Sequence, residues 1–84
     1  MELKPLLQSM PRQGRADLAA LCNTTPGHLQ NVSYGKTCSP ALAALLELHT
    51  GEQVMRWDMR PHDWHVIWRE LVGRADAPPV PVAE

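Results

Sequence analysis

The segment that decides the fold is LAALCNTTPGHLQNV, residues 18–32. Its centre contains two helix-boundary signals. Asn23 tolerates the left-handed backbone that ends a helix, and Thr25-Pro26 opens the next helix with a hydroxyl cap and a preset φ. We therefore predict two short helices, over residues 15–22 and 26–34, joined by a sharp turn.

The apolar residues of this segment recur at helical spacing, because residues three and four apart share one face of a helix. The inward positions predicted in this way are Leu18, Leu21, Cys22, Leu29 and Val32. Gln30 and Asn31 are left on the outer face of the second helix. Gly35 suits a left-handed cap at the end of that helix.

Three further helices are predicted from the same signals. Residues 3–10 have apolar side chains at helical spacing, and residues 11–14 are expected to break the chain before the next helix. Ser39-Pro40 repeats the cap-and-proline signal, so a helix is expected from there to near Gly51. Residues 62–72 form the fifth predicted helix, and its inward residues are Trp64, Ile67, Trp68 and Leu71.

Length and composition indicate one small domain. A chain of 84 residues with 44% hydrophobic content fits one domain over residues 1–72, followed by a proline-rich tail over residues 73–84 that we expect to be flexible. No apolar run approaches the roughly 18 residues needed to cross a bilayer, and residues 1–20 lack the pattern of a signal peptide. We therefore expect a soluble, cytoplasmic protein without membrane contact.

Charge is divided unevenly along a chain whose formal net charge is -1. Residues 1–36 carry four cations and two carboxylates, a balance of +2, whereas residues 37–84 carry four cations and seven carboxylates, a balance of -3. The mildly basic N-terminal half favours a modest electrostatic contribution to nucleic-acid binding over tight nonspecific coating.

The two central helices have the pattern of a helix-turn-helix, in which the start of the second helix enters the major groove. The side-chain amides of Gln30 and Asn31 match the N6 and N7 pattern of adenine, Gly27 permits close approach, and Tyr34 lies one turn further on. The base contacts expected are Gly27, Gln30, Asn31 and Tyr34. The phosphate contacts expected are Arg15, Thr25, His28 and Lys36. The competing interpretation is an ordinary solvated polar face.

Other chemistries are less well supported by the sequence. Cys22 and Cys38 have neither zinc-ligand nor redox spacing; Cys22 is expected in the core, and Cys38 in a loop without an adjacent base. His62, Asp63 and His65 lack a well-spaced further ligand for a metal. We therefore expect no metal, no cofactor and no enzymatic activity, with a small thiol enzyme as a weaker alternative.

The chain resembles the Cro-like and YdaS-like helix-turn-helix regulators of phages and prophages, some of which are described as antitoxins. The residues that carry the resemblance are Leu18-Ala19, Thr25-Pro26, His28-Leu29, Val32, Tyr34-Gly35-Lys36, Ser39-Pro40-Ala41-Leu42, Thr50-Gly51 and the run RPHDWHVIW from Arg60 to Trp68. The resemblance implies a compact five-helix, lambda-repressor-like all-α domain. It also implies that Gln30 and Asn31 occupy outward positions of the recognition helix and that Arg15 occupies a backbone-contact position.

The chain departs from that family at four positions. Asn23 stands where many relatives have glycine, Thr24 where a small aliphatic residue is usual, and Cys22 where leucine is common. Arg69 stands where the family often has proline, which is expected to let the last helix run longer.

Together these features predict a noncatalytic, sequence-specific transcriptional regulator of the repressor type. The expected partner is double-stranded operator DNA, bound by a homodimer on two half-sites about one helical turn apart. The alternative is an antitoxin or another protein-interaction module that uses the acidic, tryptophan-rich C-terminal half to bind a toxin or another regulator.

Overall fold

The fold is built from helices over the part of the chain that the computed structural model describes, residues 2–81. This part contains no strand. Its elements are α1 (Leu3–Ser9), α2 (Arg12–Leu21), α3 (Pro26–Ser33), α4 (Pro40–His49), α5 (Arg56–Met59), α6 (Trp64–Ile67) and the 3-10 helix η1 (Arg69–Leu71). The prediction of an all-α fold is confirmed, although six α-helices are present instead of five.

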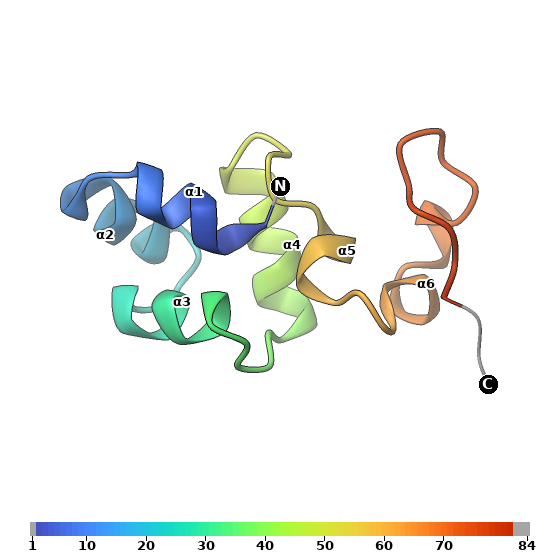
Figure 1. Cartoon of the computed structure of the whole chain (residues 1–84), viewed down its shortest axis with the longest axis horizontal. Helices are drawn as coiled ribbons and strands as arrows, with labels where there is room; N and C mark the ends of the chain where they lie inside the picture. Colours follow the sequence, from blue (N-terminus) through green and yellow to red (C-terminus); the bar gives the residue numbers. More distant parts are fainter. Residues whose placement is uncertain (1, 82–84) are drawn as a thin grey trace.

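The helices are arranged along an elongated body of 40 × 24 × 20 Å. Figure 1 shows α1, α2 and α3 at one end, α4 in the middle, and α5 and α6 leading to the other end. In the described chain, no helix is both long enough and apolar enough to span a membrane.

The start of α2 differs from the prediction. The helix begins at Arg12, three residues earlier than expected, because Pro11 acts as its N-cap residue and does not interrupt a later helix. The Pro11 backbone is extended, and its carbonyl accepts a hydrogen bond from the Arg15 amide at 3.0 Å. A proline just before the first turn removes no intrahelical hydrogen bond, so it can begin a helix as readily as end one.

The turn between α2 and α3 is formed by the residues on which its prediction was based. Asn23 has a φ of 56°, and the amide of Thr24 donates to the carbonyl of Ala19 at 2.9 Å, which ends α2 in a Schellman motif. The Thr25 hydroxyl oxygen then accepts from the His28 amide at 3.1 Å and caps α3. Both predicted boundaries are therefore confirmed.

The same signals operate at the next boundary. Gly35 has a φ of 112°, and the Lys36 amide donates to the Asn31 carbonyl at 3.1 Å, so α3 also ends in a Schellman motif. Ser39 caps α4 by accepting from the Leu42 amide at 3.2 Å. Thr25 and the Schellman motif at Gly35 therefore bound α3, and Ser39 begins α4.

A single apolar core joins the first four helices, and α4 contributes from the centre. Its buried members are Leu3, Leu6, Leu7, Leu18, Ala19, Cys22, Leu29, Val32, Cys38, Leu42, Ala43, Leu46 and Val54. Within residues 18–32, the inward orientation predicted for Leu21 is wrong, because this side chain is 54% exposed. The inward face of α2 runs through Leu18, Ala19 and Cys22, which turns Leu21 to the side.

The prediction of one continuous helix over residues 62–72 is also wrong. α6 ends at Ile67, Trp68 leaves the helical region with φ -120° and ψ 75°, and η1 follows. Ile67, expected to face inward, is exposed. Asp63 precedes α6 without capping it, because its carboxylate is held by the guanidinium of Arg60. Arg69 therefore does not extend the helix.

The segment formed by α5, α6, η1 and residues 72–81 is called the C-terminal lobe. α5 is a single turn of helix of four residues. Trp64 is 1% exposed and meets Trp57 edge to face at 5.8 Å. The Arg74 guanidinium lies over Trp57. The predicted flexibility of the tail stays a prediction, and residues 82–84 lie outside the described chain.

Candidate nucleic-acid interface

The outer face of α3 carries the four residues predicted to contact bases. Gly27, Gln30, Asn31 and Tyr34 are all exposed, whereas Leu29 and Val32 on the opposite side are buried. At 3.6 residues per turn, the four exposed positions fall within an arc of about 100° around the helix axis. The structure therefore brings them onto one continuous surface.

Gly27 is not explained by packing inside the protein. A β-carbon built at this position meets nothing within 4 Å, and the backbone of Gly27 has no positive φ. Neither steric crowding nor backbone conformation therefore requires glycine there, and the open space lies on the exposed side of α3.

A groove borders this surface where α3 meets α1 and the start of α2. We call it the α1–α3 groove, and its volume is about 490 Å³. Its polar and charged lining residues are Lys4, Gln8, Arg12, Arg15, Gln30, Ser33 and Tyr34. Three of these residues are cations and none is an acid, so the groove presents a local positive charge although the whole chain is nearly neutral.

Tyr34 contacts a cation from another helix. The Lys4 ammonium lies 4.7 Å from the centroid of the Tyr34 ring, within the range of a cation–π interaction. Tyr34 nevertheless remains 62% exposed. The pair links the first turn of α1 to the end of α3.

Arg15 has a structural role that the sequence did not indicate. Its Nη1 donates to the carbonyl of Leu7 at 3.3 Å and to the carbonyl of Met10 at 3.2 Å, where α1 ends. The Leu7 carbonyl also accepts from the Met10 amide at 3.2 Å, so the guanidinium adds to the hydrogen bonds at this end and acts as a C-terminal cap of α1. Arg15 also lines the α1–α3 groove, so it serves the fold and borders the candidate interface.

The other predicted phosphate contacts are more scattered. Thr25 is exposed at the start of α3. His28 is half-buried and lines a shallow depression with the α2–α3 turn and the start of α4, away from Gln30 and Tyr34. Lys36 is exposed and lines a second groove of about 530 Å³, which shares Lys4 and Ser33 with the first.

Two cations beside the interface were missed in the sequence. Lys4 and Arg12 are exposed and line the α1–α3 groove, but they lie at the starts of α1 and α2 and not in the central segment. The positive balance of residues 1–36 was the available signal, since these two residues supply half of its four cations. Only the packing of α1 and α2 against α3 brings both cations to the groove that Tyr34 also lines.

The cysteines are placed as packing residues. Cys38 lies in the α3–α4 loop but is 3% exposed, and burial raises the pKa of its thiol to about 11 despite the opposing charge of Arg60. Burial also raises the pKa of Cys22. A raised thiol pKa opposes formation of the thiolate, which is the nucleophilic form.

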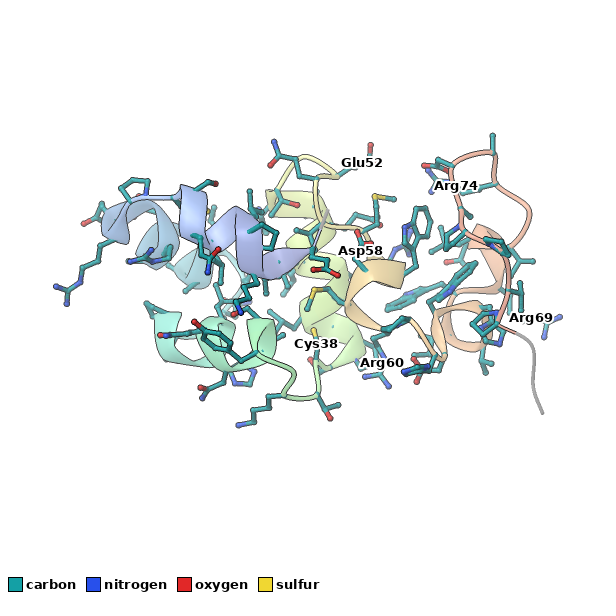
Figure 2. All side chains as sticks on the ribbon, in the orientation of Figure 1. Cys38, Glu52, Asp58, Arg60, Arg69 and Arg74 are labelled. Carbon is teal, nitrogen blue, oxygen red and sulfur yellow. The ribbon has the colours of Figure 1, made fainter. Side chains whose placement is uncertain are left out.

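Arg60 connects the C-terminal lobe to the α3–α4 loop. Its Nη1 donates to the Cys38 carbonyl, and its Nε and Nη2 form a fork with the Asp63 carboxylate at 3.0 and 2.6 Å. Figure 2 shows Arg60 and Cys38 close together between α4 and α5. The hydrogen bond from Arg60 lowers the pKa of Asp63. Within residues 2–81, no group of three or more potential ligands is arranged to hold a metal ion.

No protein-family model matches the chain, and no curated protein matches it either.

Proposed function

We propose that the chain is a sequence-specific DNA-binding regulator in which α2 and α3 form a helix-turn-helix. The observation that carries the proposal is the exposed face of α3, with two amide side chains and a glycine, beside a groove that has three cations and no acid. The motif residues that resemble Cro-like and YdaS-like regulators support the same assignment.

In this proposal, α3 enters the major groove and reads base edges. Gln30 and Asn31 each offer one donor and one acceptor to adenine, a bidentate match that discriminates by about 1–3 kcal/mol. Gly27 lets the helix approach closely. Thr25 and Lys36 contact phosphates at the two ends of α3, and Arg15 contacts a phosphate from its place beside the α1–α3 groove.

The deciding experiment is selection from random DNA duplexes, followed by the same selection with Gln30→Ala and Asn31→Ala. Loss of either amide is expected to relax base preference at one or two positions. Gln53→Ala removes an exposed amide outside the candidate interface and serves as the matched control. A base preference that neither α3 substitution changes would contradict the assignment of the reading residues.

We further propose that two copies bind one operator. Helix-turn-helix dimers contact half-sites about one helical turn apart, so the selected sequence is expected to be a palindrome with that spacing. Sedimentation of the protein with the selected duplex measures the stoichiometry directly. A selected site without two-fold symmetry, bound by one copy, would contradict this part of the proposal.

A second candidate function is protein interaction through the C-terminal lobe, as in an antitoxin. It is favoured by the exposed apolar side chains of Val66, Ile67 and Val72 in this acidic half, since Trp64 is buried and unsuited to docking. Val66→Ser is expected to abolish copurification of one defined partner, whereas Leu48→Ser, an exposed apolar position on α4, is not. Loss of the partner together with absence of DNA binding by the intact protein would favour this function over the first.

We also propose a noncatalytic role. A thiol enzyme is disfavoured by the burial of Cys22 and Cys38 and by the upward direction of both thiol pKa shifts. Retention of all measured binding in Cys22→Ser and Cys38→Ser variants that remain folded would agree with this proposal.

A further inference from the structure

The α1–α3 groove contains cations whose positions oppose local helix stability. Lys4 lies in the first turn of α1, and Arg12 is the first residue of α2. A helix N-terminus carries a partial positive charge, so a cation there is unfavourable where a carboxylate would be favourable. Neither first turn contains an acidic residue. Helix stability therefore does not account for these two side chains.

The two cations also have few partners inside the protein. Among residues 2–81, neither Lys4 nor Arg12 makes a side-chain hydrogen bond or an ion pair, and the Lys4 ammonium lies over the face of the Tyr34 ring. Asp17, one of the two carboxylates in residues 1–36, accepts a hydrogen bond from Gln13. The other carboxylate, Glu2, lines the second groove and not this one, so the α1–α3 groove itself has no acid among its lining residues.

We propose that the α1–α3 groove binds one phosphodiester strand, that Lys4 contacts a phosphate there, and that the Tyr34 ring is the positioning group for Lys4. The inference rests on the proposed DNA-binding function and adds the path of one strand along α1. Arg12, which lines the same groove from the start of α2, contacts the same strand. The second groove is less suited to an anion, because Glu2, Asp58 and Asp63 are among its lining residues.

The contact between Lys4 and Tyr34 explains how the ring can hold the lysine ammonium in place. A lysine side chain has several rotatable bonds, and holding its ammonium in one place loses rotamer entropy. The Tyr34 ring attracts the ammonium through its face and so restricts Lys4 before the ligand arrives. The ammonium remains available because Lys4 is exposed.

The test measures the salt dependence of binding to a random-sequence duplex, starting at low salt. Removing one phosphate-binding cation lowers the slope of log K against log salt by about 0.9, which corresponds to about eightfold weaker binding near 0.1 M salt. Lys4→Gln and Arg12→Gln are each expected to show this effect, with an unchanged or slightly higher Tm. Arg69→Gln is the charge-matched control, because Arg69 is exposed at the far end of the molecule (Figure 2).

Two variants of Tyr34 separate positioning from direct contact. Tyr34→Phe keeps the ring and is expected to bind like the original protein, whereas Tyr34→Leu removes it and is expected to weaken binding about twofold to fivefold. In the Lys4→Gln background, Tyr34→Leu is expected to have no further effect. Equally weakened binding in Tyr34→Phe and Tyr34→Leu would show that the hydroxyl itself acts and would overturn the positioning role.

The outcomes distinguish this inference from the proposed function. If Lys4→Gln and Arg12→Gln behave like Arg69→Gln while Gln30→Ala still relaxes base preference, the groove assignment is overturned and the proposed function stands. If their salt slopes fall but selection recovers no preferred sequence, the groove assignment stands and sequence-specific reading fails. If the protein binds no random duplex even at about 50 mM salt, both are overturned.

Discussion

At the scale of single residues, Gly27, Gln30 and Asn31 on the outer face of α3 are exposed. Leu29 and Val32 bury one side of the helix, and Gly27 has open space where its side chain would be. Such positions tolerate substitution in the fold, so a loss of binding upon substitution reports on a partner and not on folding.

Gly27→Ala tests this separation directly. Alanine is the better helix former, so the free energy of unfolding is expected to rise by up to about 0.5–1 kcal/mol, while DNA affinity falls because the new methyl group hinders close approach. Urea unfolding and DNA titration measure the two effects. Unchanged affinity in a stabilised variant would place the α3 surface away from the DNA.

At the scale of elements, two arginines add hydrogen bonds between segments that lie beside one another. α1 and α2 are linked by Arg15, whose guanidinium donates to the carbonyls of Leu7 and Met10 at the end of α1. The C-terminal lobe and the α3–α4 loop are joined by Arg60 in the same way, through the Cys38 carbonyl. Each arginine therefore links two segments through backbone carbonyls.

Arg15→Ala is therefore expected to affect both folding and binding. Loss of two hydrogen bonds from a charged donor to part-buried carbonyls is expected to lower the free energy of unfolding by about 1–2 kcal/mol, together with weaker DNA binding. Lys36→Ala is the comparison, because Lys36 is exposed and its substitution is expected to weaken binding without changing stability. Equal stability of the two variants in urea unfolding would contradict the capping role of Arg15.

At the scale of the whole molecule, the core around α4 contains residues from α1, α2 and α3. Cys38 shows this most clearly, since it belongs to a loop yet is buried with residues of α1, α2, α3 and α4. Its thiol pKa of about 11 is a property of the assembled core, because burial removes the water that would stabilise a thiolate.

The reactivity of Cys38 is thus expected to report on the whole fold. At about pH 8, below the ordinary thiol pKa, the folded protein is expected to react slowly with a thiol reagent, and fast labelling of both cysteines is expected in denaturant. The raised folded pKa also contributes stability that is complete below the ordinary thiol pKa of 9.0 and is lost as the pH rises toward about 11. Rapid labelling of Cys38 under native conditions would contradict its burial.

The local features of the fold follow from neighbouring residues alone. The left-handed Asn23, the Thr25 and Ser39 caps, and the outward face of α3 depend on contacts within about one helical turn, so the sequence determines them. The break at Trp68 was not predictable in this way. It accompanies the stacking of Trp68 against Arg56, and Arg56 in turn pairs with Glu47 of α4.

The candidate interface also has one part that the sequence determines and one part that depends on tertiary packing. The sequence by itself determined the outer face of α3, because helical periodicity places Gln30 and Asn31 opposite the buried Leu29 and Val32. Only the tertiary structure decided the groove beside it, where Lys4 and Arg12 come from two other helices. Charges far apart in the chain act together only after burial of the core has packed their helices side by side, and no local pattern encodes that packing.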